Sequence, residues 1–268
     1  MIFCCNYSTL FQSYWLFLYQ IHFMQVDSNW FKEWFNTPYY HTLYKHRDYK
    51  EAERFIKNLI AYLNLKPNSK CLDLACGKGR HAEQLCSYNF DVIGVDLSEN
   101  SILEAKKLEK ENLSFDVHDM RQVYKEDHFD AIFNLFTSFG YFDDTSENLK
   151  MLQSVNTMLK SDGVFLMDFM NAEKVIENLV PKEEKTIDGI NFKIKREFDG
   201  KHIFKNIKFS DQGEDFEFTE RVQALKKDEL LSLFNEANLK VTQTFGDFDL
   251  NPYNSKKSNR LILLAQKQ

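Results

Sequence analysis

The sequence contains few of the residues that mark several other classes of protein. Only 9 glycines and 4 prolines occur among 268 residues, and with 43% hydrophobic and 28% charged residues the composition argues against collagen-like and disordered chains. The five cysteines are odd in number and no two have C-x-x-C spacing, so we expect free thiols in a reducing compartment. Cysteine and histidine residues are not clustered at ligand spacing, and the sequence predicts no metal site.

An excess of basic residues is also missing. Lysine and arginine number 34 against 40 aspartates and glutamates, which gives a formal net charge of −6 at pH 7. Affinity for nucleic acids depends on clustered positive charge, so we expect no nucleic-acid partner. A chain of this length buries a sizeable core on its own, in one large domain or two small ones.

The first 23 residues contain no lysine, arginine, aspartate or glutamate. A signal peptide would have a basic start and a small-residue cleavage site, and both are missing. The apolar run over residues 14–19 is shorter than the span of about 20 residues that crosses a membrane. We therefore expect residues 1–23 to be a start-site artefact or a dispensable extension, with Met24 as the start, in a cytoplasmic protein without membrane contact. A helix packed on the domain and a membrane-associated segment are the alternatives.

Hydrophobic spacing changes along the rest of the chain. Between residues 27 and 64 it is helical, with Trp30 and Trp34 on one helix face, and Pro38 interrupts the pattern. After residue 67, short apolar strands alternate with helices, which predicts a parallel sheet covered on both faces. The strands are expected at residues 70–74, 91–95, 113–118, 129–135 and 163–170, and the helices at 80–88, 98–111 and 144–159.

Residues 185–221 depart from this alternation. Period-two stretches are separated by turn signals such as Asp188-Gly189 and Asp199-Gly200, which predicts a small antiparallel sheet inserted into one α/β domain. A helix at 227–238 and two closing strands complete the domain. The predicted units are N-terminal helices at 24–66, an α/β core at 67–184 and 222–268, and the insertion at 185–221.

The loop after the first predicted strand has the strongest functional signal. The strand ends at Asp73, and Gly77 and Gly79 follow before a helix begins. Glycines let a backbone approach a ligand closely, and a helix start offers free N–H groups. Asp96, at the end of the next strand, is placed to accept hydrogen bonds from both ribose hydroxyls of a nucleotide.

Two kinds of nucleotide fit this loop. Gly77-x-Gly79-x-x-Ala82 matches the dinucleotide fingerprint of NAD enzymes loosely. The Asp73 carboxylate would repel a pyrophosphate, whereas it suits a cationic amino-acid ligand. S-adenosylmethionine (SAM) has adenine, ribose, sulfonium and α-amino groups and no phosphate, and it is therefore favoured.

From roughly residue 47 to the C-terminus the chain resembles the class I SAM-dependent methyltransferases, on five motifs in order. The motifs are matched by Asp73-x-x-x-Gly77-x-Gly79, Asp96, His118-Asp119-Met120, residues 129–141 and residues 159–166. Ala75 stands where a common form of the first motif has glycine. The resemblance implies a Rossmann-like α/β fold with a mostly parallel seven-stranded sheet, helices on both faces and the small antiparallel insertion.

The resemblance also implies SAM as the cofactor and a set of site residues. Arg47 is expected near the cofactor carboxylate and Asp119 near the adenine amino group, while Tyr40, His41 and Tyr141 are candidate bases or orienting groups for the acceptor. The implied cofactor-binding residues are Tyr44, Arg47, Asp73, Ala75, Cys76, Gly77, Gly79, His81, Asp96, Leu97, Ser98, His118, Asp119, Met120, Asn134, Leu135 and Ser138.

The order of the predicted units is similar to that of small-molecule methyltransferases that act on amino sugars or glycine-like amines. It implies transfer of the sulfonium methyl group to an N or O atom of a small metabolite, with residues 24–66 as a lid and the insertion roofing the pocket. The acceptor, the choice between N and O, and the choice between monomer and homodimer stay open. The alternatives are a non-catalytic SAM-binding protein, an NAD(P)-dependent oxidoreductase, and a methyltransferase acting on RNA or protein.

Overall fold

The computed structural model describes residues 30–45, 49–135 and 138–268, apart from the side chains at positions 49 and 51. The predicted extension at residues 1–23 and the predicted cofactor residue Arg47 lie outside this part of the chain. None of the described helices combines the length and the hydrophobicity that crossing a membrane requires.

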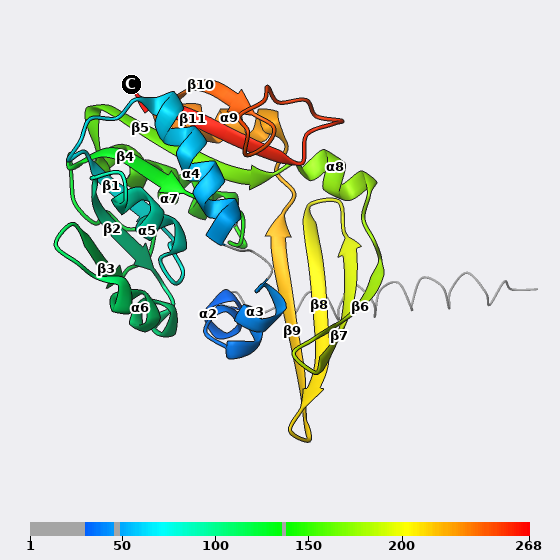
Figure 1. Cartoon of the computed structure of the whole chain (residues 1–268). Coiled ribbons are helices and arrows are strands. Elements are labelled where there is room, and N and C mark those ends of the chain that lie inside the picture. Colours follow the sequence, from blue (N-terminus) through cyan, green and yellow to red (C-terminus); the bar gives the residue numbers. More distant parts are fainter. Residues whose placement is uncertain (1–29, 46–48, 136–137) are drawn as a thin grey trace, which may run out of the picture.

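A seven-stranded sheet forms the centre of the larger part of the molecule (Figure 1). Its strands are β1 (Lys70–Leu74), β2 (Asp91–Asp96), β3 (Leu113–Val117), β4 (Phe129–Asn134), β5 (Leu159–Met170), β10 (Leu239–Phe245) and β11 (Arg260–Lys267). They are ordered β10-β11-β5-β4-β1-β2-β3, and only β11 runs antiparallel to its neighbours. The predicted mostly parallel seven-stranded sheet is confirmed.

Helices cover both faces of this sheet, as predicted. One face packs against α4 (Tyr49–Leu63), α5 (Arg80–Cys86) and α6 (Glu99–Ala105), and the other against α7 (Thr145–Met158) and α9 (Lys227–Glu236). Strand β1 shows the reason. Leu72 and Leu74 pack on the side of α7 and α9, Cys71 packs on the side of α4, α5 and α6, and all three are fully buried. A strand that is apolar on both sides needs cover on both faces.

The strand order changes direction at β1. Strands β2 and β3 lie on one side of β1, and β4 and β5 lie on the other. The connections that leave β1 and β4 therefore diverge, which opens a crevice at the carboxyl ends of these strands. Asp73, Asp96 and Asn134 all lie at these ends.

A separate antiparallel sheet follows α8 (Ala172–Glu177). It consists of β6 (Lys182–Ile187), β7 (Ile190–Phe198), β8 (His202–Asp211) and β9 (Glu214–Gln223), paired in chain order. The sheet starts earlier and ends later than the predicted residues 185–221, because β6 already pairs at Lys182 and β9 is still paired at Gln223.

Two short helices, α2 (Trp30–Phe35) and α3 (Pro38–Leu43), lie against this antiparallel sheet on the side of the core (Figure 1); we call them the lid helices. The Trp34 Nε1–H group donates a hydrogen bond of 2.7 Å to Glu220 on β9. The Tyr44 hydroxyl, just after α3, donates to the same carboxylate at 2.7 and 2.8 Å. The lid helices are therefore attached to the antiparallel sheet, whereas α4 packs on the core sheet.

Candidate active site

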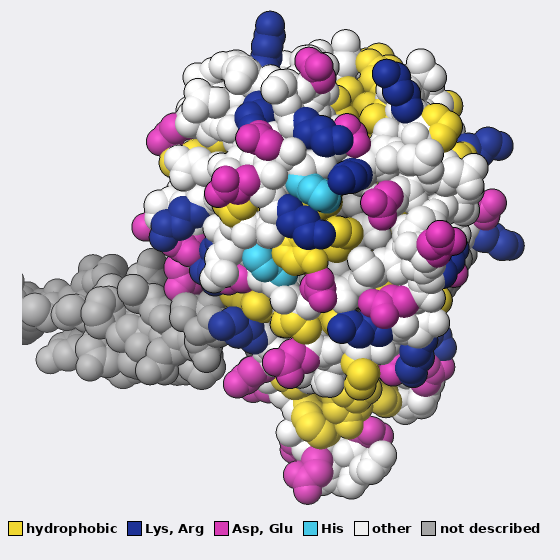
Figure 2. Space-filling model, turned by 90° about the vertical axis from the view of Figure 1, so that its left-hand side faces the viewer, with side chains coloured by type: hydrophobic (Ala, Val, Ile, Leu, Met, Phe, Trp, Pro, Cys, Tyr) yellow, Lys and Arg dark blue, Asp and Glu magenta, His cyan; other side chains and the backbone are white. Residues whose placement is uncertain are grey.

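A cavity of about 310 Å³ lies at the carboxyl ends of the core strands, beneath the lid helices. Most predicted site residues line it, namely Tyr40, His41, Tyr44, Ala75, Cys76, Gly77, His81, Asp96, Leu97, His118, Asp119, Met120, Leu135, Ser138 and Tyr141. Figure 2 views the molecule from the side of β3 and α6, and shows hydrophobic side chains near the centre of this face with lysine, arginine and histidine side chains around them. The cavity therefore combines side chains from the core with side chains from the lid helices.

The loop after β1 forms the floor of the cavity. Ala75 adopts φ 63° and Gly77 φ 56°, both in the left-handed region. A Cβ atom at Gly77 would meet nothing within 4 Å, so the loop leaves open space there for a ligand. The Cys76 N–H group donates to the Val95 carbonyl at 2.9 Å and holds the loop against β2.

The side chain of Asp73 is buried directly beneath this loop, with 1% of its surface exposed. Its Oδ2 atom has no hydrogen-bond partner among the described residues. Burial is the main cause that raises the pKa of Asp73 to about 7. Asp73 does not line the cavity, but a cationic group entering above it would supply the missing partner.

Asp96 connects the loop to the next helix. Its Oδ2 atom accepts a hydrogen bond from the Gly77 N–H group at 2.9 Å, and its Oδ1 atom accepts one from the Ser98 N–H group at 2.8 Å. Burial raises the pKa of Asp96, and these N–H groups act in the opposite direction. Ser98 lies behind the cavity, where its hydroxyl caps α6 by accepting from the Ser101 N–H group at 3.1 Å.

Gly79 and Asn134, two further predicted residues, also lie behind the cavity wall. A Cβ atom at Gly79 would come within 2.6 Å of the Phe115 ring, so a larger residue here would require the packing to shift. Asn134 donates from Nδ2 to the Leu74 carbonyl at 2.8 Å and to the Ser138 hydroxyl at 2.9 Å. It therefore ties the ends of β1 and β4 to a residue of the lining.

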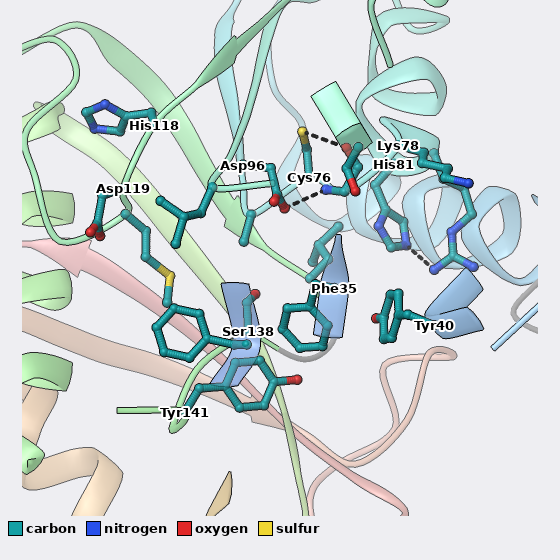
Figure 3. A pocket seen from close by; sticks show the side chains of 18 of the residues that line it. Phe35, Tyr40, Cys76, Lys78, His81, Asp96, His118, Asp119, Ser138 and Tyr141 are labelled. Atoms are coloured by element: carbon teal, nitrogen blue, oxygen red, sulfur yellow. Dashed lines mark hydrogen bonds between the residues drawn. The ribbon is translucent and has the colours of Figure 1, made fainter. Parts of the chain in front are cut away.

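Asp119 and His118 lie together at one end of the cavity (Figure 3). The Asp119 carboxylate forms an ion pair with Arg121 at 2.5 Å, and Arg121 also contacts Glu147 at 2.7 Å. Burial would raise the pKa of Asp119, but the hydrogen bonds and charge of Arg121 hold it below its usual value. An ionised, oriented carboxylate is thus available at this end of the cavity.

The opposite wall is aromatic. The ring of Phe35 lies 4.7 Å from that of Tyr40 and 5.3 Å from that of Tyr141, measured between centroids. Burial, followed by the charge of Lys78, lowers the pKa of His41 to about 4, so this imidazole is neutral at pH 7. His81 is also neutral, because burial and then Arg80 lower its pKa to about 3.

Several lining residues were not predicted from the sequence: Phe31, Phe35, Lys78, Arg80, Ser101, Arg121 and Phe142. Lys78 stands inside the glycine loop motif and Arg80 directly follows it. Phe31 and Phe35 stand one helical turn apart, so local spacing could have indicated all four. Arg121 gave no comparable signal, because its role depends on Glu147 from a distant helix. Among the described residues, no three His, Cys, Asp or Glu side chains are grouped so as to hold a metal ion.

Ala75 offers a prediction about stability. Its φ of 63° is disfavoured for alanine because the Cβ atom crowds the following carbonyl group, and glycine has no such atom. We expect Ala75→Gly to raise the free energy of unfolding by about 1 kcal/mol in urea denaturation. Ala82→Gly in helix α5 is the control, where a loss of about 1 kcal/mol is expected. An unchanged or lower stability of Ala75→Gly would contradict the strain at this position.

The fold and the cavity together define a class of protein, because a Rossmann-like sheet with a glycine loop and an acidic second strand end is typical of nucleotide-binding domains. A family model described as a methyltransferase domain matches residues 65–238. The chain belongs to this family. It is a SAM-dependent methyltransferase, and its cofactor is SAM.

Named relatives agree with this assignment. The glycine/sarcosine N-methyltransferase of Aphanothece halophytica is 30% identical over 210 residues, which cover 75% of this chain and 76% of the relative. A dTDP-3-amino-3,4,6-trideoxy-α-D-glucopyranose N,N-dimethyltransferase of Streptomyces venezuelae is 29% identical over 122 residues, 46% of this chain and 51% of that protein. The predicted enzyme class is confirmed over the oxidoreductase alternative.

Solved structures show the same fold. A SAM-dependent methyltransferase from Clostridium acetobutylicum superposes with a TM-score of 0.73 at 23% identity, covering 85% of this chain and 96% of that chain. SAM-bound CalS10, an amino pentose methyltransferase from Micromonospora echinaspora, superposes with a TM-score of 0.65 at 17% identity, covering 87% and 98%. At these identities the similarity establishes the architecture.

Proposed function

We propose that this methyltransferase transfers a methyl group to an amine nitrogen of a small metabolite. The observation that carries the proposal is the aromatic cavity between the lid helices and the cofactor loop. His41 lines this cavity, and with a pKa of about 4 it is neutral and a weak base. A hydroxyl acceptor needs a base to remove its proton, whereas a neutral amine can attack without one. Two relatives whose names specify N-methyl transfer support the same choice.

For the cofactor, the residues of the chain fit the chemical groups of SAM. Bound SAM supplies an activated methyl group on its sulfonium. The buried, unpartnered Oδ2 of Asp73 would attract the ammonium group, and Asp96 would accept hydrogen bonds from the ribose hydroxyls. Asp119 would meet the adenine amino group, with Arg121 keeping its carboxylate ionised. Apolar contact with the adenine ring would come from Leu97, Met120 and Leu135.

For the acceptor, we propose the aromatic end of the cavity. Tyr40, His41 and Tyr141 would orient the amine, and aromatic faces attract the positive charge that develops on the nitrogen during transfer. The lid helices exclude water from this end. The antiparallel sheet contributes none of the described lining residues, so it lies one layer behind the lid rather than directly over the cavity.

The test is transfer of labelled methyl from SAM to a panel of amino acids and amino sugars, beside hydroxyl compounds of the same shape, tRNA and unfolded protein. We expect transfer to one class of small amine. His41→Gln should lower kcat/KM by less than the factor of about 100 that marks the loss of a general base. Transfer only to the hydroxyl compounds, or only to a macromolecule, would contradict the proposal.

A further inference from the structure

The turn between the two lid helices is hydrogen-bonded to the cofactor-binding core through Asn36. Its Oδ1 atom accepts hydrogen bonds from the Ser98 hydroxyl at 3.0 Å and from the Asn100 N–H group at 3.1 Å. Its backbone carbonyl accepts a third from Asn100 Nδ2 at 3.1 Å. The Asn36 side chain is therefore the acceptor in both of these hydrogen bonds.

These contacts continue a line of hydrogen bonds that begins at the cofactor loop. The Gly77 N–H group donates to one oxygen of Asp96 and the Ser98 N–H group donates to the other, at 2.9 and 2.8 Å. The Ser98 hydroxyl then donates to Asn36. The carboxylate proposed to bind the ribose is thus separated from the lid by a single residue, Ser98, which is 8% exposed.

Phe35, the neighbour of Asn36 in the chain, forms part of the aromatic wall. Figure 3 shows its ring between Asp96 and Tyr141. The Phe35 ring also lies 5.6 Å from that of Trp30, edge to face. A displacement of the turn at Asn36 would therefore move a side chain that bounds the acceptor end of the cavity.

On its other side the lid is hydrogen-bonded to the antiparallel sheet. Tyr39 donates to Asp211 at 2.9 Å, and Trp34 and Tyr44 donate to Glu220. These bonds fix the lid to the insertion, whereas ring contacts such as that of Trp30 with Tyr141 and the hydrogen bonds of Asn36 join it to the core. The aromatic wall depends on both attachments.

We propose that Asn36 is a positioning residue that acts through Ser98 on Asp96, so that the ribose site and the aromatic wall at Phe35 are set together. The inference rests on the proposed role of Asp96 in binding ribose. Asn36 itself is not among the described residues that line the cavity.

The experiment compares Asn36→Ala, Asn36→Asp and wild type in the full chain. S-adenosylhomocysteine and adenosine, which share the ribose, are titrated by calorimetry. Asn36→Ala should weaken both ligands by about fivefold, the effect of losing the hydrogen bonds that brace Ser98. Asn36→Asp keeps an acceptor oxygen at the same place, and it should stay within about twofold of wild type for both ligands.

A spectroscopic measurement reports the lid directly. Trp30 and Trp34 stand on α2, so adding S-adenosylhomocysteine should change the tryptophan emission of wild type and of Asn36→Asp, and less so that of Asn36→Ala. Lys45→Ala is the matched control, because it removes an exposed ion pair with Asp188 on the other side of the lid. Its affinity should stay within about twofold of wild type.

Equal affinities of Asn36→Ala and wild type would overturn the proposal, and so would an Asn36→Asp variant as weak as Asn36→Ala. If Asn36 contributes only to stability, Asn36→Ala should lower the unfolding temperature, and Asn36→Asp should not restore ligand affinity. Asp96→Ala separates the two levels of the argument. If it binds both ligands as tightly as wild type, the proposed role of Asp96 is wrong and the inference fails with it. If Asp96→Ala loses them while Asn36→Ala does not, only the inference fails.

Discussion

Replacing Asp73 by asparagine is expected to stabilise the protein without its cofactor and to weaken SAM binding by about 100-fold or more. The carboxylate is 1% exposed and one of its oxygens has no partner among the described residues, so ionising it in the folded protein is costly. Asparagine has no charge to bury. The same charge is the proposed partner of the SAM ammonium group, so its loss removes a buried attraction.

The pH dependence follows from the shift of this group. The pKa of Asp73 rises from 3.8 to about 7 on folding, so its contribution to stability is fully present below pH 3.8 and is lost as the pH rises through 7. The unfolding free energy of the wild type without cofactor should therefore fall over this range. At about pH 8 Asp73→Asn should exceed the wild type by up to about 4 kcal/mol, and at about pH 5 by much less.

Urea denaturation at the two pH values measures the stability, and calorimetric titration with SAM measures the binding. Asp162→Asn is the matched control, because Asp162 is an exposed aspartate of strand β5. It should change neither quantity. An Asp73→Asn variant that is less stable than wild type at the higher pH, or that binds SAM normally, would contradict the proposed role of this carboxylate.

The cofactor loop was the part of the site most accessible to sequence analysis. Asp73, Gly77 and Asp96 lie at or just after the ends of two apolar strands, and parallel strands bring their carboxyl ends to one edge of the sheet. Their placement therefore follows from local patterns and from the rule for strand order. The strand ends and the cavity lining agree with that expectation for Gly77 and Asp96.

The lid and its attachments could not be obtained in the same way. The bond from Trp34 to Glu220 joins residues 186 positions apart, and helical spacing indicates only that Trp34 is buried, without naming its partner. The same holds for Arg121, because its ion-pair partner Glu147 lies on helix α7. Hydrophobic spacing predicts that a side chain is buried, whereas the partners of polar side chains depend on tertiary packing.

At Gly79 the motif was visible in the sequence, whereas the packing around this glycine was not. The sequence indicated a close approach to the cofactor, but the described structure places this residue behind the cavity, at φ +82°. A Cβ atom here would lie 2.6 and 2.7 Å from two atoms of the Phe115 ring, and one at Gly94 would lie 2.5 Å from the same ring. The two glycines thus form the space that Phe115 occupies between α5 and the sheet.

Gly79→Ala is expected to lower the free energy of unfolding by about 3 kcal/mol, from the strained φ together with the overlap in a packed core. Gly77→Ala is the matched control, because its Cβ atom would meet nothing within 4 Å and only the strain of φ +56° remains. It should lose about 1 kcal/mol of stability, yet it should weaken SAM binding because the methyl group enters the cavity. Urea denaturation and SAM titration of the two variants separate these effects.

A double-mutant cycle tests the cause assigned to Gly79. Phe115 is 1% exposed, and Phe115→Leu removes the ring atoms that the new Cβ would meet. In that background Gly79→Ala should cost about 1–2 kcal/mol, the part due to backbone strain alone. If Gly79→Ala costs the same in both backgrounds, contact with Phe115 is not the reason for the glycine. If Gly79→Ala instead keeps its stability and loses only SAM, the residue acts at the cofactor, as the motif alone had predicted.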